Sequence, residues 1–87
     1  MKQTAKPYTL YILRCSDDTY YTGIALDVEK RLNEHNSSDK GAKYTRHRRP
    51  VTLMYQESCS DKSAALKRER AIKAMKRSAK EALWICG

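Results

Sequence analysis

Residues 8–23, which read YTLYILRCSDDTYYTG, contain the pattern that decides the fold. The first eight of them are rich in aromatic and branched side chains, which predicts a buried β-strand over 8–15. The Ser-Asp-Asp sequence that follows is typical of a turn, and a second strand is expected over 19–22, ended by Gly23. The stretch therefore predicts a β-hairpin near the start of the chain.

The length of the turn decides which side chains share a face of this hairpin. Three loop residues, 17–19, would pair Ser16 with Tyr20. That register places Tyr11 and Tyr21 on one face, whereas a two-residue loop would separate them. Tyrosine in a strand is usually a packing residue whose hydroxyl reaches water. The sequence leaves both registers open.

Helices and one further strand are expected after the hairpin. They are a helix from Asp27 to about Asn36, one or two helical turns over 42–49, a strand over 51–57, a helix from Ser60 or Asp61 to about Lys76, and a short helix from a Ser78-x-x-Glu81 capping box to Ile85. The order β-β-α-(α)-β-α-α predicts an α+β fold, a small α/β sandwich in which helices flank a three-stranded antiparallel sheet. At 87 residues we expect one domain over 1–87, with its core over about 8–77.

The chain is strongly basic, with 18 Lys and Arg against 10 Asp and Glu and a net charge of +8. This excess favours a polyanionic partner, nucleic acid first, because neutralised phosphates release condensed counterions. An anionic membrane is the weaker alternative, since no helix has a clean apolar face opposite a basic one, and a merely solvated surface is the plain one. The expected phosphate-tracking residues are Lys43, Tyr44, Arg46, Arg48 and Arg49, with Tyr44 available to stack on an unpaired base.

The cysteines and the apolar runs exclude several classes of protein. Cys15, Cys59 and Cys86 form no CxxC pair, so neither a zinc site nor a disulfide framework is indicated. No run approaches the ~18 apolar residues that span a bilayer, and the first residues lack the apolar stretch of a signal peptide. We expect a cytoplasmic protein without a membrane partner.

Two ionisable residues of the first helix are expected to face the body of the protein. At about 100° per residue, His35 falls beside Val28 and near Leu32. Arg31 lies on the edge of that apolar stripe, four residues before His35. Such a pair could hold a phosphate and a neighbouring proton. The alternative is a satisfied buried histidine beside a surface arginine.

Glu69 presents a similar choice on the later helix. It lands between Ala65 and Leu66, inside the arc that faces the core. A carboxylate there is costly unless it pairs or binds a metal. An internal ion pair with an arginine is the alternative to a metal site.

These residues match a known pattern. The triplet TLY at 9–11, followed ten residues later by YTG at 21–23, resembles the paired motif that names the GIY-YIG nucleases. Arg31 and His35 stand in the helix position of that family, and Glu69 occupies the place of its metal-binding glutamate. The resemblance covers almost the whole chain.

Further details place the chain within that resemblance. Residues 41–45, GAKYT, look like the signature of small stand-alone bacterial members. Thr9 replaces the glycine of the first triplet and Thr22 the isoleucine of the second. Ile24 stands where the DNA-repair branch tends to carry lysine, so the excision nuclease is not a close match. No second DNA-binding domain is expected, which argues against sequence specificity.

The resemblance implies hydrolysis of a nucleic-acid phosphodiester, DNA for preference, by an in-line water, with one Mg²⁺ or Mn²⁺ held by Glu69. Tyr11 would be the general base or orient the water, and Tyr21 would position the phosphate or share that role. Arg31 would offset charge on the phosphoryl oxygens, and His35 would orient a tyrosine hydroxyl or move a proton. We expect all five side chains on one concave face.

Two other functions compete with this one. A catalytically weak or silent nucleic-acid-binding module on the same fold is the main alternative, since a fold does not guarantee activity. A protein-interaction domain that uses its basic face is the second. DNA repair or recombination is the candidate process for a nuclease, and the oligomeric state is left open.

Overall fold

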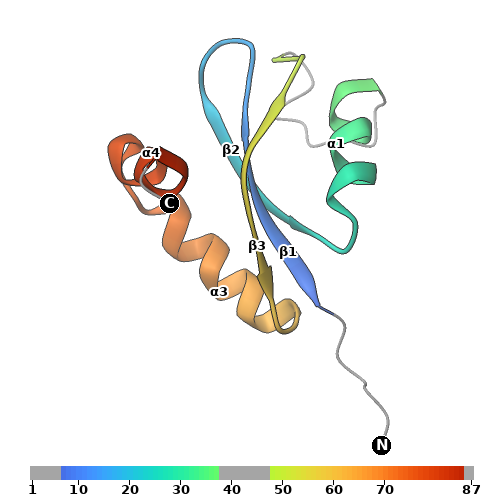
Figure 1. The fold of residues 1–87 in the computed structure, drawn as a ribbon, viewed down its shortest axis with the longest axis vertical. Helices are drawn as coiled ribbons and strands as arrows, with labels where there is room; N and C mark the ends of the chain where they lie inside the picture. Colours follow the sequence, from blue (N-terminus) through green and yellow to red (C-terminus); the bar gives the residue numbers. More distant parts are fainter. Residues whose placement is uncertain (1–6, 38–47, 86–87) are drawn as a thin grey trace, which may run out of the picture.

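The computed structural model describes residues 7–37 and 48–85. Within them, one antiparallel sheet has the strand order β2-β1-β3, and helices cover both of its faces (Figure 1). The elements are β1 (Tyr8–Arg14), β2 (Tyr20–Ala25), α1 (Val28–Ser37), β3 (Thr52–Cys59), α3 (Lys62–Lys73) and α4 (Arg77–Ile85). The predicted α+β class with a three-stranded antiparallel sheet is confirmed.

The hairpin of β1 and β2 takes the register that keeps the two motif tyrosines together. Leu13 lies opposite Tyr21, and Tyr11 lies opposite Gly23. Because side chains alternate along a strand, Tyr11 and Tyr21 project from the same face of the sheet.

The turn explains this register. The backbone N–H of Cys15 donates to the carbonyl oxygen of Thr19 at 2.8 Å, so the loop has three residues, 16–18. Of the two loop lengths left open by the sequence, the three-residue one is found, one position earlier than 17–19. Asp18 ends the loop with a φ of 68°, in the left-handed region that aspartate tolerates better than bulky residues do. The Asp17 carboxylate accepts hydrogen bonds from the hydroxyl and the N–H of Thr19, at 2.6 and 3.2 Å.

β2 runs through Gly23 to Ala25, so the predicted strand over 19–22 began one residue too early and ended three residues too early. A Cβ on Gly23 would lie 2.6 Å from the Oη of Tyr11 and 3.2 Å from the Cε2 of Tyr21. The position therefore needs glycine because an aromatic ring occupies the space of a side chain.

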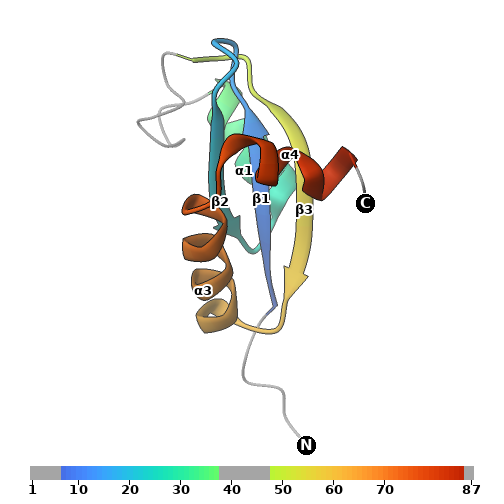
Figure 2. The ribbon, with the colours of Figure 1, turned by 90° about the vertical axis from the view of Figure 1, so that its left-hand side faces the viewer.

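The sheet separates two apolar clusters, as the period of two along β1 requires. The cluster beneath α1 contains Tyr11, Leu13, Cys15, Ala25 and Val51, with Val28 and Leu32 of α1 packed against it. The opposite cluster contains Leu10, Ile12 and Ile72 and is covered by α3 and α4 (Figure 2). The two faces of one hairpin thus meet different helices.

The beginnings of two helices follow the sequence. The Asp27 carboxylate accepts from the N–H of Lys30 at 3.1 Å, and the Asp61 carboxylate accepts from the N–H of Ala64 at 2.8 Å. The helical turns predicted over 42–49 fall mainly on residues outside the described part of the chain. Of the helices that are described, none is long and apolar enough to cross a membrane.

The predicted capping box at Ser78 is wrong. α4 begins at Arg77, which puts Ser78 inside the helix. The Glu81 carboxylate accepts from the hydroxyl of Tyr20 at 2.7 Å and pairs with Arg77 at 3.1 Å. The Glu81 side chain, which a capping box would direct to the start of the helix, therefore contacts Tyr20 and Arg77 instead.

Candidate active site

The hydroxyl of Tyr11 lies inside the protein, beneath α1. Tyr11 is 2% exposed and His35 is fully buried, and the Tyr11 Oη lies 3.1 Å from the His35 Nε2. Val28 and Leu32 pack against the same cluster, so the apolar stripe of α1 directs the His35 ring to the sheet. The predicted placement of His35 on that stripe is confirmed.

His35 is neutral at physiological pH. Burial, followed by the positive charges of Arg31 and Arg49, lowers the pKa of His35 to about 4, with Glu34 opposing them. Its carbonyl oxygen accepts a hydrogen bond from the Nε of Arg49 at 2.6 Å, which ties this end of α1 to the segment before β3. The neutral ring either accepts from the Tyr11 hydroxyl or donates to it, according to its tautomer.

The Tyr11 hydroxyl is protonated in the free chain. Burial raises the pKa of Tyr11 to about 12, against a hydrogen bond from Arg31 that lowers it. The nearby Tyr21 and Glu69 also raise this pKa. A phenol in this environment does not ionise by itself near pH 7.

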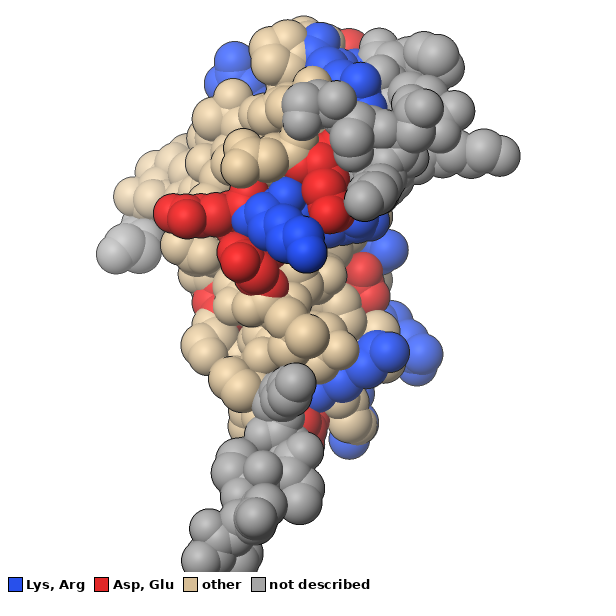
Figure 3. All heavy atoms as spheres, turned by 90° about the vertical axis from the view of Figure 1, so that its right-hand side faces the viewer, with Lys and Arg blue, Asp and Glu red and all other residues tan. Residues whose placement is uncertain are grey.

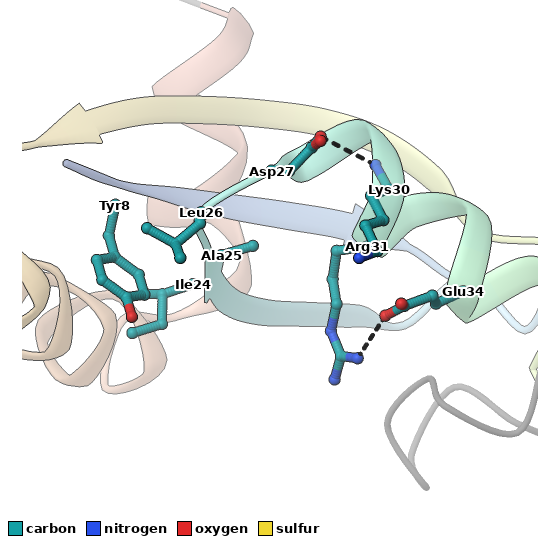
Figure 4. A pocket seen from close by; sticks show the side chains of 8 residues that line it. All are labelled: Tyr8, Ile24, Ala25, Leu26, Asp27, Lys30, Arg31 and Glu34. Carbon is teal, nitrogen blue, oxygen red and sulfur yellow. Dashed lines mark hydrogen bonds and ion pairs between the residues drawn. The ribbon is translucent and has the colours of Figure 1, made fainter. Parts of the chain in front are cut away.

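Arg31 enters the site from the edge of α1. Its guanidinium donates to the Tyr11 hydroxyl and pairs with the Oε1 of Glu34 at 3.0 Å (Figure 4). Burial lowers the pKa of Arg31, but the hydrogen bonds to Glu34 and Tyr11 outweigh burial and raise it. Glu34 was not among the predicted site residues, although an acid three residues after an arginine on a helix is a readable pairing signal.

Tyr21 completes the group on this face. Its ring centre lies 5.4 Å from that of His35 and 6.5 Å from that of Tyr11. Unlike Tyr11, it is only partly buried. Four of the five predicted catalytic side chains, Tyr11, Tyr21, Arg31 and His35, therefore lie together under α1, and we call them the α1 site.

Glu69 approaches from the other face of the sheet. It belongs to α3, which packs on β2 and β1 opposite α1 (Figures 1 and 2). Its side chain is 19% exposed and pairs with the Nζ of Lys73 at 3.4 Å, a lysine and not the arginine that the sequence analysis weighed. Its charge raises the pKa of Tyr11 slightly, as the smallest of the influences on that group, so the two groups act on each other electrostatically although they belong to opposite faces of the sheet.

The five side chains thus do not project from one face of the sheet. Ala65 and Ile72 hold α3 against the face opposite the α1 site, and Glu69 stands beside them at the edge of the buried arc. Gly23 lies in β2 opposite Tyr11, and the Tyr11 ring fills the space that a side chain at Gly23 would occupy on the α1 face.

The donor set restricts the kind of metal site that is possible. Residues 7–37 and 48–85 hold no group of three or more His, Cys, Asp or Glu that could bind a metal ion. A site of the zinc kind, closed by protein ligands, does not fit these residues. Mg²⁺ and Mn²⁺ fit better, because Mg²⁺ commonly keeps several waters and binds one or two carboxylates plus substrate oxygens, and Glu69 supplies one carboxylate that is 19% exposed.

The predicted phosphate-tracking residues are only partly described. Lys43, Tyr44 and Arg46 lie outside the described residues. Arg48 pairs with Asp17 at 2.9 Å, at the hairpin turn, and Arg49 donates to the backbone of His35. Both arginines therefore brace the fold around the α1 site. Figure 3 shows acidic side chains next to basic ones on the face that α1 presents, so that face is not uniformly basic.

Comparison with known proteins gives consistent matches. Residues 7–82 match the GIY-YIG catalytic domain. A UPF0213 protein of Desulfotalea psychrophila is 51% identical over 82 residues, which cover 93% of this chain and 74% of that protein. A UPF0213 protein of Halobacterium salinarum is 55% identical over 75 residues, which cover 86% of this chain and 96% of that protein.

Two solution NMR structures are similar to this fold. One, of a UPF0213 protein from Bacillus halodurans, has 40% identity and a TM-score of 0.56, and the match covers 88% of this chain and 81% of that one. The other, of a protein from E. faecalis, has 42% identity and a TM-score of 0.61, with 93% and 84% covered.

Proposed function

This chain belongs to the GIY-YIG family of nuclease domains, and from that membership we propose that it is a divalent-metal-dependent endonuclease acting on nucleic acid, DNA for preference. The observation that carries the proposal is the buried Tyr11 hydroxyl, held between a neutral His35 and the guanidinium of Arg31. The net charge of +8 supports a polyanionic substrate. A part in DNA repair or recombination would suit such an activity.

Arg31 is suited to the phosphate. Because Glu34 and Tyr11 both accept from its guanidinium, the charge is held in a fixed position at the rim of the site. A preorganised arginine stabilises the charge that develops on phosphoryl oxygens during in-line attack. Tyr21, partly exposed and close to both rings, would contact the same phosphate.

Tyr11 and His35 are suited to the attacking water. Since the Tyr11 phenol is protonated, its hydroxyl would orient the water and not deprotonate it unaided. The neutral imidazole ring of His35, whose Nε2 lies 3.1 Å from the Tyr11 Oη, can accept a proton passed through the hydroxyl as the water attacks phosphorus. As the bond from the water oxygen to phosphorus forms, the bond from phosphorus to the 3′-oxygen breaks, and the 3′-oxygen takes a proton from solvent water.

Glu69 is the residue that would hold a divalent cation. When bound, the cation would offset negative charge on the phosphoryl oxygen and on the leaving 3′-oxygen. Glu69 would in that case exchange the ion pair with Lys73 for the stronger attraction of a divalent charge.

One observation favours a second candidate, a nucleic-acid-binding module with little catalysis. A tyrosine with a pKa of about 12 and a histidine with a pKa of about 4 are both far from the values that suit a general base near pH 7. The same side chains could hold a phosphate without cleaving it.

Incubation with labelled duplex, branched and single-stranded DNA and RNA, in Mg²⁺, Mn²⁺ or EDTA, tests the proposal. We expect cleavage only with a divalent ion. Glu69→Gln should bind nucleic acid in EDTA like wild type but not cleave it. Glu57→Gln is the matched control, because Glu57 is also a partly buried ion-paired carboxylate, bound to Arg68 at 2.8 Å, and it should cleave normally.

Melting curves with and without Mn²⁺ give a second measurement. A ligand that binds only the folded state raises the melting temperature, so wild type and Glu57→Gln should show the rise and Glu69→Gln should not. Binding of nucleic acid without cleavage under any condition, and without a metal-dependent rise, would replace the nuclease proposal by the binding module.

A further inference from the structure

A hollow of about 320 Å³ lies at the end of β2, next to the α1 site (Figure 4). One part of its lining is apolar and comprises Tyr8, Ile24 and Leu26. The other part is polar and includes Lys30, Arg31 and Glu34. Figure 4 shows the apolar side chains gathered at one end and the Arg31–Glu34 pair at the other, so the hollow joins two different chemistries.

The apolar end exposes side chains that usually avoid water. Leu26 is 55% exposed, and the Tyr8 ring and Ile24 beside it are only partly buried. Ile24 packs with the α3 face of the sheet, whereas Ala25 belongs to the cluster under α1. The hollow therefore passes around the end of the outer strand, from the side of α3 to the side of α1.

Arg31 belongs to both the hollow and the α1 site. Its guanidinium donates to the Tyr11 hydroxyl and at the same time lines the hollow. A phosphate that contacts Arg31 would place the nucleotide attached to it at the mouth of the hollow, because a base lies only a few bonds from its phosphate.

We infer that the hollow binds one unpaired nucleobase of the nucleic acid whose phosphate lies at Arg31. This inference rests on the proposed function, in that it takes Arg31 to contact a nucleic-acid phosphate. A base has two apolar faces and a polar edge, which match the Tyr8–Leu26 end and the Arg31–Glu34 end respectively. Aromatic side chains stack on bases of any sequence, and a volume near the lower limit of ligand pockets suits a single base.

The required base is an unpaired one. In a continuous duplex both faces of each base are covered by its neighbours, so Tyr8 could stack only on a base that has left the stack. The hollow therefore selects single-stranded segments, flaps, loops or frayed ends over uninterrupted duplex.

A second copy of this chain is the other possible occupant of the exposed apolar surface. The charged side chains form the other half of the lining: Asp27, Lys30, Arg31 and Glu34. Charged residues are depleted from the buried centre of protein interfaces, so the lining suits a nucleotide better than an apolar side chain of a partner.

The test compares two ligands of equal charge in EDTA, where no cleavage is expected. They are a five-nucleotide single strand and an abasic sugar-phosphate chain of the same length. Wild type should bind the first about tenfold more tightly, the effect of one stacked base. Tyr8→Leu and Leu26→Ser should lose most of that advantage. The control is Ile85→Ser, which changes an isoleucine that is 71% exposed at the end of α4, away from the hollow, and this variant should keep the advantage.

Chemical-shift mapping on wild type makes the test independent of the variants' stability. The base-containing strand should shift the resonances of Tyr8 and Leu26 and leave those of Ile85 in place. Equal affinity for the two ligands, or an undiminished advantage in folded Tyr8→Leu and Leu26→Ser, would overturn the inference. Self-association that Leu26→Ser abolishes, without any preference for the base-containing strand, would overturn it in favour of a second copy.

The outcome is separable from that of the proposed function. A base-dependent affinity that involves Tyr8 and Leu26, in a chain that cuts nothing with Mn²⁺, would refute the nuclease and leave the base site standing. Metal-dependent cleavage with no base-dependent affinity would do the reverse.

Discussion

Tyr20 and Tyr21 are neighbours in β2, yet they belong to two polar clusters of different character. Tyr21 lies in the α1 site, whereas Tyr20 faces α4. The hydroxyl of Tyr20 donates to Glu81 at 2.7 Å, the guanidinium of Arg77 lies 4.2 Å from its ring centre, and Trp84 meets the ring edge-on at 5.3 Å. We call Asp18, Tyr20, Arg77, Glu81 and Trp84 the α4 clamp.

The difference lies in the groups that surround the arginine of each cluster. In the α4 clamp, Arg77 pairs with the carboxylates of Asp18 and Glu81 at 3.3 and 3.1 Å, so opposite charges meet at a solvent-exposed position. In the α1 site, Arg31 pairs with one carboxylate, that of Glu34, and lies beside a buried tyrosine and a buried histidine that are both neutral.

Among the described residues, the two large pKa shifts, of Tyr11 to about 12 and of His35 to about 4, both lie on the α1 face, whereas Tyr20 and Arg77 on the other face are shifted less. Large shifts of this kind are typical of functional sites, which makes the α1 site the candidate and the α4 clamp its structural counterpart.

The largest expected effect is the acid sensitivity of the α1 site. The unfolded chain protonates His35 near pH 6.5, whereas the folded chain protonates it only near pH 4. The free energy of unfolding is therefore unaffected by this histidine above pH 6.5. It decreases by on the order of 3 kcal/mol as the pH falls from 6.5 to 4, because the unfolded chain binds the proton first. Urea unfolding at pH 7, 5 and 4 measures it.

His35→Gln is the variant that isolates this effect. It removes the titrating ring, so its free energy of unfolding should fall less steeply over the same pH range. Equal slopes in wild type and His35→Gln would mean that the histidine is not held neutral by the fold.

A methyl group at Gly23 tests whether the α1 site depends on the close approach of the Tyr11 ring to the β2 backbone. The added Cβ of Gly23→Ala would lie 2.6 Å from the Oη and 2.8 Å from the Cζ of Tyr11. The Tyr11 ring must move away from residue 23, which disturbs its contact with His35, and such overpacking costs about 1–3 kcal/mol. Thermal unfolding and the NMR titration of His35 should both report the change.

Thr22→Val provides the matched control at the neighbouring position. Within the described residues, the hydroxyl of Thr22 is buried and has no hydrogen-bond partner. Replacing it by a methyl of similar shape should leave stability unchanged or raise it. Loss of stability in Thr22→Val equal to that in Gly23→Ala would show that β2 is merely intolerant of substitution.

The smallest expected effect concerns the α4 clamp. Tyr20→Phe removes one partly buried hydrogen bond to Glu81 and leaves the ring contacts with Arg77 and Trp84 in place. The free energy of unfolding should fall by about 1 kcal/mol, measured in urea. A much larger loss would mean that the α4 clamp stabilises the fold more than its exposed ion pairs predict.

Local signals predicted most of the elements. Asp27 and Asp61 begin helices because each stands before an apolar periodicity and can accept a backbone N–H. The stripe of Val28 and Leu32 predicted the burial of His35 from geometry alone. These features depend on residues within one or two helical turns of each other, so the local sequence pattern predicts them.

Features that depend on distant contacts were missed. The hairpin register was left open because it depends on the left-handed backbone of Asp18, a residue that also fits the competing turn. Gly23 was taken for a strand end because only the ring of Tyr11 opposite shows why glycine is needed there. The packing of α3 on the face opposite α1, which separates Glu69 from the other four side chains, is a tertiary choice that no local pattern in the sequence expresses.

The most direct test of the account compares Tyr11→Phe with Tyr20→Phe in a cleavage assay with Mn²⁺. Both variants remove one hydroxyl from the same hairpin, one in the α1 site and one in the α4 clamp. Tyr11→Phe should lower the cleavage rate by about 10²–10⁴-fold, the usual contribution of a positioned proton-transfer group, while its affinity for nucleic acid in EDTA stays unchanged. Tyr20→Phe should cleave like wild type. Wild-type cleavage by Tyr11→Phe, or equal losses in the two variants, would contradict the assignment of hydrolysis to the α1 site.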